Sequence, residues 1–256
     1  MDLGLRGRTA LITGASSGIG EAIALGLASE GVRLALAART AQRLDTVARE
    51  AERLGAAGAA AFALDLTDPD SIALALERVV REFAAVDIVV LNGGGPKAGR
   101  FTEMSLGDWD SSYQLLLRSM LVILETVVPA MRARKWGRIV ALTSTSVKQP
   151  IDNLVLSNAF RTALVSALRT LAVEVAPDGV TVNCIATGRI ETDRLRKIYG
   201  DDEERLRQAA REVPVGHFAT PREFAPAAVF LCGEPARYIT GQTISVDGGL
   251  VRGLFG

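Results

Sequence analysis

The chain has 256 residues, of which 48% are hydrophobic and 23% charged, enough for one sizeable core in a single α/β domain. Lys and Arg together number 29, as do Asp and Glu, so this balance argues against nucleic acid or an acidic membrane as a partner. Residues 1–8 lack the charged start and apolar core of a leader segment, and no apolar run reaches the length of a membrane span. We therefore expect a cytoplasmic protein with no nucleic-acid and no membrane partner.

Short apolar runs alternate with segments of helical periodicity in the first third of the chain. The runs predict strands at residues 9–12, 32–38, 59–64 and 88–91. Helices are predicted between them at 18–30, 41–54 and 69–83, and Gly31, Gly55 and Pro69 stand at the helix ends where these residue types are favoured. This alternation predicts a parallel sheet with helices on both faces.

The same alternation continues to the end of the chain. The remaining elements are predicted as a long helix, a strand, a helix, a strand, a helix and a strand, at 105–131, 137–143, 152–176, 180–185, 221–232 and 243–246. The whole chain, 1–256, is thus predicted to form one doubly wound, Rossmann-like α/β domain with a sheet of about seven strands.

One segment, 193–212, interrupts this order with many charges and few apolar anchors. Two interpretations stay open. A solvated surface helix has this composition, whereas an insertion beside the carboxyl end of a strand lies where open sheets bind ligands and is suited to a substrate lid.

The cysteines and the single histidine show no metal-site pattern. Cys184 and Cys232 lie far apart in apolar segments and have no C-x-x-C spacing, so both are predicted to be core thiols, with no metal site. His217 is expected to be a loop residue or a subunit contact.

The turn Thr13-Gly14-Ala15-Ser16-Ser17-Gly18-Ile19-Gly20 lies between the first predicted strand and helix. Its glycines permit backbone conformations closed to other residues and let a phosphate approach the main chain, while the N–H groups that open the helix face that anion. A strand before and a helix after it favour nucleotide binding over a tight connection that binds nothing.

Several separated motifs resemble those of the short-chain dehydrogenase/reductase family. The glycine turn matches T-G-x-x-x-G-x-G, Asp65-Leu66 follows the third strand, and Leu91-Asn92-Gly93-Gly94 takes the place of N-N-A-G. The end of the chain also matches the family's usual ending, with I-T-G-Q at 239–242 and V-D-G-G at 246–249. Residues 214–223 look most like those of 3-oxoacyl-carrier-protein reductases.

This resemblance implies a nicotinamide dinucleotide bound along the carboxyl edge of the sheet. The glycine turn would hold the pyrophosphate, Asp65 would meet the adenine, and Asn92 and Gly93 would pass beside the ribose of the nicotinamide. The full implied cofactor set is Gly14, Ser16, Ser17, Gly18, Ile19, Gly20, Arg39, Asp65, Leu66, Asn92, Gly93, Arg161, Gly188 and Thr192. Two simpler explanations remain open: Asp65 as a helix cap, and the glycines 93–95 as a tight turn.

The end of the second strand decides between the two cofactors. A carboxylate there binds free ribose hydroxyls and repels a 2′-phosphate, but this chain has Ala38-Arg39. The planar guanidinium of Arg39 suits a phosphate, so NADP(H) is favoured over NAD(H). A surface arginine at the strand end is the alternative.

The family's catalytic pattern is only partly present. The serine aligns with Ser144, whereas the tyrosine falls on Ser157 and the lysine on Arg161. The family asparagine falls on Leu116 and a proline on Thr187. A serine hydroxyl is a far poorer acid than a phenol, whose unperturbed pKa is about 10. Arg161 stays charged, so it is expected to hold the ribose.

Three other side chains are weaker candidates for the proton donor: Lys148, Lys97 and Tyr199. Two functions are therefore compared. The first is an oxidoreductase that transfers a hydride between NADP(H) and a carbonyl or hydroxyl group of a small-molecule or acyl-carrier substrate. The second is a dinucleotide-binding protein with little or no reductase activity, a regulator or a partner subunit, because Ser157 and Arg161 replace the tyrosine and lysine. The resemblance also implies a homotetramer.

Overall fold

The computed structural model describes residues 1–200 and 202–254, although not the side chains of residues 197–199. Its strands form one parallel sheet in the order β3-β2-β1-β4-β5-β6-β7. Their bounds are β1 Thr9–Thr13, β2 Arg33–Ala38, β3 Ala59–Ala63, β4 Ile88–Leu91, β5 Gly137–Leu142, β6 Val180–Thr187 and β7 Thr243–Val246. The predicted doubly wound sheet of seven strands is confirmed, and its strand order reverses between β1 and β4.

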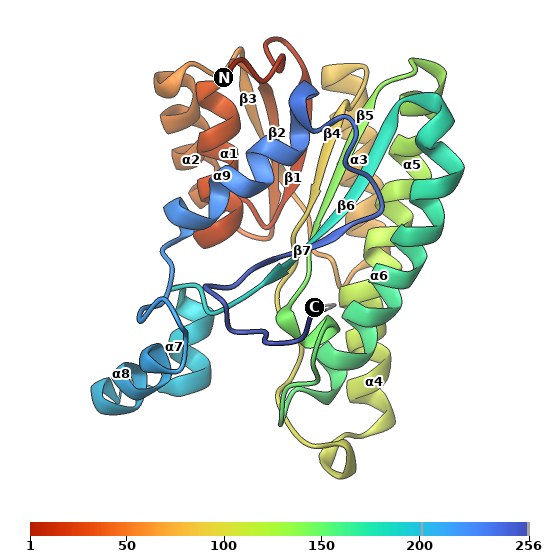
Figure 1. Cartoon of the computed structure of the whole chain (residues 1–256). Coiled ribbons are helices and arrows are strands. Elements are labelled where there is room, and N and C mark those ends of the chain that lie inside the picture. Colours follow the sequence, from red (N-terminus) through yellow and green to blue (C-terminus); the bar gives the residue numbers. More distant parts are fainter. Residues whose placement is uncertain (201, 255–256) are drawn as a thin grey trace.

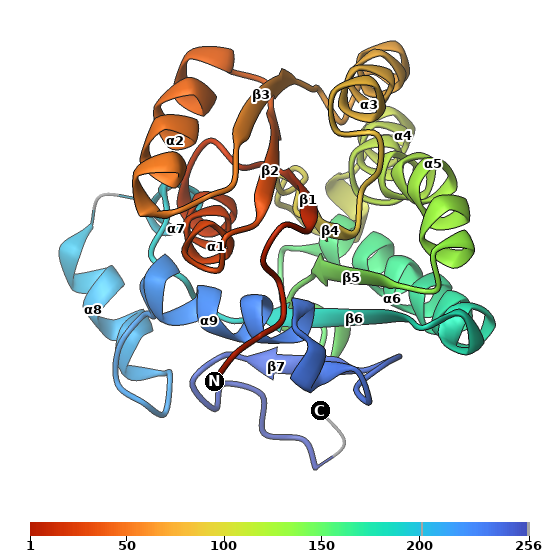
Figure 2. The ribbon, with the colours of Figure 1, turned by 90° about the horizontal axis from the view of Figure 1, so that it is seen from above.

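Helices cover both faces of the sheet (Figures 1 and 2). One face packs against α1 (Gly18–Ser29), α2 (Ala41–Leu54) and α9 (Pro221–Cys232), and the other against α3 (Pro69–Phe83), α5 (Ser119–Ala133) and α6 (Val155–Val175). Successive strand residues point to opposite faces: Ile12 lies in the first core cluster and its neighbour Leu11 in the second. Both faces are therefore dry, which explains why the strands are continuous apolar runs.

The long helix predicted at 105–131 is one helical rod that contains a π-helical turn. It comprises α4 (Leu106–Tyr113), the π-turn Gln114–Arg118 and α5. Within the described residues, this helix, Leu106–Ala133, alone is long and apolar enough to cross a membrane, and 39% of its most apolar window is buried. This helix differs from the expectation that no apolar run reaches the length of a membrane span. Met120, Ile123 and Val127 pack into the core against the sheet, which accounts for the apolar composition.

The charged segment 193–212 forms two helices instead of one. α7 (Asp193–Tyr199) ends at Gly200, whose φ of 77° suits glycine, and α8 (Glu203–Arg211) begins after Asp202. The carboxylate of Asp202 accepts hydrogen bonds from the N–H groups of Glu204 and Arg205, at 3.0 and 3.1 Å. Both helices lie at the lower left of Figure 1, beyond the carboxyl ends of the strands.

Both cysteines are buried core thiols, as predicted. Cys184 lies on β6 and Cys232 on α9, and neither forms a disulfide. Burial raises the pKa of each thiol to about 12, so both stay protonated at neutral pH.

Candidate functional site

The glycine turn lies at the carboxyl end of β1, where the strand order reverses. Gly14 and Gly18 have φ values of 62° and 60°, which glycine adopts without strain, and a side chain on Gly20 would strike the Gly14 carbonyl oxygen. Ser17 precedes α1 and makes no side-chain capping bond, so the first N–H groups of α1 are left for another acceptor. An anion held at this helix start fits the geometry.

Asn92 joins the end of β4 to the glycine turn. The Thr13 hydroxyl donates to the Asn92 carbonyl at 2.7 Å, the Asn92 N–H donates back to that hydroxyl at 2.8 Å, and the Asn92 side-chain amide donates to the Gly14 carbonyl at 3.3 Å. These bonds hold the two loops of the switch point together. Asn92 therefore positions the glycine turn.

Asp65 and Leu66 follow β3 on the other side of Asn92. Partial burial alone would raise the pKa of Asp65, but hydrogen bonds from the Thr67 N–H and hydroxyl and the charge of Arg39 lower it below its ordinary value. The cap of α3 is Asp68, so Asp65 is not the helix cap that the sequence left open. A side chain on Gly93 would lie 3.2 Å from the Leu66 side chain, which shows how close these loops approach.

A cleft of about 450 Å³ opens between the glycine turn and the start of α2. Ser16, Ser17, Glu21 and Thr40 line it together with Arg43, which no motif singled out in the sequence and whose charge acts on Glu21. Arg39 lies exposed at the end of β2, and its positive charge acts on Asp65. Arg43 lies in the first turn of α2, close in sequence to the end of β2, and this position was the available signal.

Ser144 follows β5 and precedes a single 3₁₀ turn, Thr145–Val147. Its side-chain oxygen accepts a hydrogen bond from the Ser146 N–H at 3.1 Å. Because a hydroxyl has one proton and two lone pairs, this bond leaves the Ser144 proton for donation to another oxygen.

Ser157 and Arg161 lie one turn apart on α6, hence on one face of that helix. Ser157 is buried, with 4% of its surface exposed. The Arg161 guanidinium donates to the carbonyls of Leu142 and Gly94, at 2.9 and 3.3 Å, and so spans the ends of β5 and β4. Desolvation, and then the nearby charge of Arg194, lower the pKa of Arg161 to about 10, so it remains a cation at neutral pH.

Arg194 is a second residue that sequence reasoning missed. It belongs to α7, yet its guanidinium occupies the place where a side chain of Gly95 would lie. Desolvation lowers its pKa too. Gly188 and Thr192 precede it: Gly188 packs against Asp247, and the Thr192 methyl would lie 3.3 Å from a side chain on Gly18.

The three weaker proton-donor candidates are placed differently. Lys97 forms an ion pair with Asp108 at 3.0 Å. Lys148 is half-buried, and its charge lowers the pKa of Cys184 against the larger effect of burial. Tyr199 lies in α7, and its side chain is outside the described residues.

Two further departures from the family pattern, and His217, are also placed. Leu116 is buried in the π-turn, and Thr187 ends β6 with its hydroxyl buried and without a hydrogen-bond partner. His217 is exposed and lies 3.2 Å from Glu223. Within residues 1–200 and 202–254, no group of three or more His, Cys, Asp or Glu side chains is placed to hold a metal.

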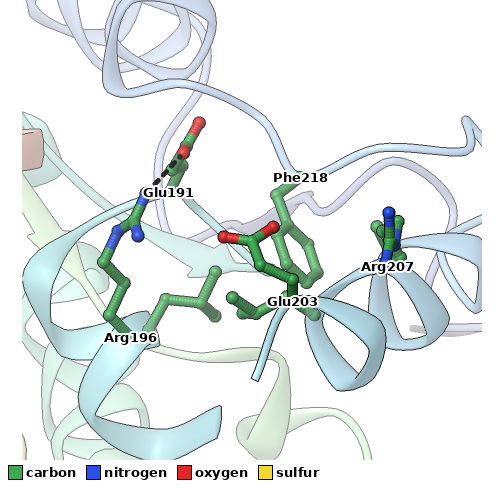
Figure 3. A pocket seen from close by; sticks show the side chains of 8 residues that line it. Glu191, Arg196, Glu203, Arg207 and Phe218 are labelled. Carbon is green, nitrogen blue, oxygen red and sulfur yellow. Dashed lines mark hydrogen bonds and ion pairs between the residues drawn. The ribbon is translucent and has the colours of Figure 1, made fainter. Parts of the chain in front are cut away.

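The two helices of the candidate lid enclose a small hollow of about 190 Å³ (Figure 3). Leu195, Leu206 and Phe218 form its apolar lining, and charged side chains stand around them. At its rim, Arg196 pairs with Glu191 at 3.4 Å. Leu195 is the buried anchor of α7.

A parallel sheet with a glycine turn at its strand-order reversal, and with a serine and an arginine at the ends of the next strands, has the arrangement of a dinucleotide-binding fold. A family profile described as enoyl-(acyl carrier protein) reductase matches residues 14–251. The 3-oxoacyl-[acyl-carrier-protein] reductase FabG of Escherichia coli (strain K12) is 35% identical over 248 residues, which cover 97% of this chain and 99% of that protein. The chain belongs to the short-chain dehydrogenase/reductase family and is an oxidoreductase of that family.

Solved structures agree with this assignment. The L-sorbose reductase of Gluconobacter frateurii, in complex with NADPH and L-sorbose, is 36% identical with a TM-score of 0.92, over 99% of this chain and 100% of that one. YwfH, an NADPH-dependent reductase involved in bacilysin biosynthesis, is 27% identical with a TM-score of 0.92, over 97% and 100% of the two chains. The fold is therefore that of NADPH-dependent reductases.

Proposed function

We propose that this protein is an NADP(H)-dependent reductase of a 3-oxoacyl or related carbonyl compound. The observation that carries the proposal is the meeting of two groups of residues at one edge of the sheet. The glycine turn offers the unused N–H groups of α1 to an anion, and Ser144 and Arg161 stand at the ends of the next strands. These two groups of residues would hold a cofactor and a carbonyl group next to each other.

The cofactor assignment to NADP(H) depends on the two arginines near the end of β2. Arg39 lies exposed there, and Arg43 lines the cleft beside Ser16 and Ser17. A 2′-phosphate in that cleft gains charge-assisted hydrogen bonds from guanidinium groups, whereas a carboxylate would repel it. The NADPH bound to the L-sorbose reductase and the NADPH dependence of YwfH support the same choice.

When bound, the dinucleotide would supply the hydride, and residues of the protein would stabilise the substrate oxygen as it gains negative charge. The Ser144 proton is unused by its neighbours, so it donates to the substrate oxygen and orients it. Arg161 is held at the ends of β4 and β5 and places positive charge nearby, which lowers the free energy of the developing alkoxide. Ser157 lies buried one turn away on the same helix.

The departure at Ser157 gives the proposed reaction a slow proton transfer. Loss of a general acid typically costs about 10²–10⁴-fold in rate. We therefore propose that water or one of the candidates Lys148, Lys97 and Tyr199 delivers the proton after Ser144 and Arg161 have stabilised the charge.

One experiment separates the reductase from a protein that only binds the cofactor. NADPH and NADH are titrated by fluorescence, and carbonyl compounds are then scanned for NADPH consumption by the wild type and by Ser144→Ala. We expect NADPH to bind more tightly than NADH, and turnover to fall about 10²-fold in Ser144→Ala with unchanged NADPH affinity. Tight binding with no consumption of NADPH by any carbonyl compound would contradict the reductase and leave the regulator or partner subunit.

We further propose that the chain forms a homotetramer in the cytoplasm, where dinucleotide pools are maintained. Large apolar side chains are exposed on α5, α6 and the chain's final segment: Leu121 at 40%, Val173 at 72% and Leu254 at 96%. Such groups favour burial between copies. Light scattering coupled to size exclusion tests the assembly, and a monomer at micromolar concentration would contradict it. The helices α7 and α8 remain the candidate lid over a small-molecule or acyl-carrier substrate.

A further inference from the structure

Two guanidinium groups meet at the end of β4, and no carboxylate of the described residues forms an ion pair with either. Arg161 reaches Gly94 from α6 and hydrogen-bonds only to carbonyl oxygens. Arg194 reaches the adjacent Gly95 from α7, and no carboxylate of the described residues pairs with it. Asp193 precedes Arg194 in sequence but forms no ion pair with it in the described structure, and two other charged neighbours are paired: Arg196 with Glu191 and Lys97 with Asp108.

The position of Arg194 depends on two features of the chain. Gly95 lacks a side chain, and any other residue there would fill the space that the guanidinium occupies. The start of α7 is fixed beside the glycine turn, because the Thr192 hydroxyl accepts the Leu195 N–H at 3.4 Å and Leu195 is buried. The arginine side chain therefore extends from the glycine-turn side of the site to the end of β4.

The proximity of these charges is unfavourable without a ligand. Arg194 is close enough for its charge to lower the pKa of Arg161, and partial burial lowers the pKa of Arg194 itself. Like charges in a poorly hydrated place repel, and an anion between them converts that repulsion into attraction. Each guanidinium has five N–H donors. Arg161 uses one N–H on each of two nitrogens for carbonyl oxygens, so donors remain for a ligand.

We propose that Arg161 and Arg194 form an anion-binding pair that holds a carboxylate of the substrate, so that the protein reduces free oxo acids. This inference rests on the proposed function and narrows its substrate class.

A carboxylate fits better than a phosphate of the cofactor. The pyrophosphate has the N–H groups of α1, and the 2′-phosphate has Arg39 and Arg43. Arg161 instead donates to Leu142, two residues before Ser144, which places the pair on the side where the carbonyl reacts. Planar guanidinium forks match a planar carboxylate.

The test compares acids with their neutral esters. Pyruvate, acetoacetate and levulinate are each assayed against the methyl ester by NADPH consumption, in the wild type, Arg194→Gln and Arg194→Lys. We expect at least one acid to exceed its ester about tenfold or more in kcat/KM, the loss expected for one charge-assisted hydrogen bond being roughly 10- to 100-fold. Arg194→Gln should abolish this preference and Arg194→Lys should keep part of it. Arg196→Gln, a matched change on the same helix, should leave it intact.

A binding measurement keeps the inference testable without turnover. Calorimetry follows oxamate and malonate binding to the wild type and Arg194→Gln, with and without saturating NADP⁺. Weaker binding in Arg194→Gln, with NADPH affinity changed less than about threefold, supports the pair. Equal use of acids and esters by an active enzyme, or no binding of either anion, overturns it while the reductase stands. An NADPH affinity that falls as much as the acid preference assigns Arg194 to the pyrophosphate and also overturns it. Failure of NADPH to bind contradicts the proposed function separately.

Discussion

The arginines at the amino and carboxyl edges of the sheet, where the strands begin and end, differ in whether a carboxylate of the described residues pairs with them. At the amino edge, Arg138 is 1% exposed, donates to the carbonyls of Gly137 and Gly179 at 2.9 and 3.2 Å, and pairs with Glu234 at 3.4 Å. It also lies 4.4 Å from the Trp136 ring, over which Arg8 lies at 3.8 Å. At the carboxyl edge, Arg161 and Arg194 have no such carboxylate among the described residues.

The difference separates stability from binding. Desolvation lowers the pKa of Arg138, but Glu234 and the carbonyls compensate the buried charge, so this region stabilises the fold. At the carboxyl edge the compensation is incomplete, and a ligand has to complete it. Carboxyl ends of parallel strands are where open α/β sheets bind ligands, which supports the proposal that the carboxyl edge is the functional one.

The largest effect is expected when the glycine turn is altered. In Gly20→Ala, the added methyl group would strike the Gly14 carbonyl oxygen and lie 2.7 Å from the Asn92 amide nitrogen, so the turn has to open. NADPH affinity should fall about 100-fold or more, as expected when several main-chain donors lose their geometry. Fluorescence titration measures it. Gly253→Ala, whose added methyl group meets nothing within 4 Å, is the control; equal affinity in both variants would show that the turn holds no cofactor.

The amino edge should show the reverse behaviour. Arg138→Met removes the ion pair with Glu234 and the donors to two carbonyls, so the free energy of unfolding should fall by about 2–3 kcal/mol in urea titrations. The folded variant should bind NADPH normally. Arg161→Ala is the matched change at the carboxyl edge and should lose turnover with little loss of stability. A large loss of stability there would remove the distinction between the edges.

A smaller effect is expected at the end of β2. Arg39→Ala should weaken NADPH about tenfold and NADH much less, because only NADPH has the 2′-phosphate. Titration of both cofactors into the variant measures the ratio. Arg43→Ala should act in the same direction, since Arg43 lines the same cleft. Equal losses for NADPH and NADH would point to a structural role for Arg39.

The smallest effect concerns the pair Lys97 and Asp108. Hydrogen bonds from the Ser105 N–H and hydroxyl, and then from Lys97, lower the pKa of Asp108 to about 2. Its folded pKa lies below the unfolded value of about 3.9, so its contribution to stability is present above that pH and is lost as the pH falls through 2. Lys97→Gln should raise this pKa only part of the way, as followed by NMR of the carboxyl carbon. An unchanged pKa would show that Lys97 is unpaired and keep it as a proton donor.

Most of the fold was predictable because its helices show a helical period and its strands are short apolar runs. The strands are continuous apolar runs buried on both faces, and the bounds of α2 and α3 agree with the prediction at both ends. The break at Gly200 was missed because neither flanking helix has an apolar stripe wide enough to mark its length. The length of the helix Leu106–Ala133 was predicted, but the expectation that no apolar run reaches the length of a membrane span does not hold for it.

The site was predictable only where residues match a motif in sequence. The glycine turn, Asn92, Ser144 and Arg161 meet at the expected edge, although their roles in cofactor binding and catalysis stay predictions. Arg194 had no such signal. It is distant in sequence from Gly95, and only the folded chain shows that a missing side chain on one residue makes room for the other.

Trp136 stacks against two guanidinium groups, so its fluorescence can report on this part of the protein. The chain has only two tryptophans. Trp136 reports on the amino edge. Trp109 lies on α4, and its ring centroid is 5.8 Å from that of Phe101 and 5.7 Å from that of Phe160. Replacing either one by phenylalanine leaves a single fluorophore, so emission during unfolding can follow the stable edge and the ligand-binding half of the molecule separately.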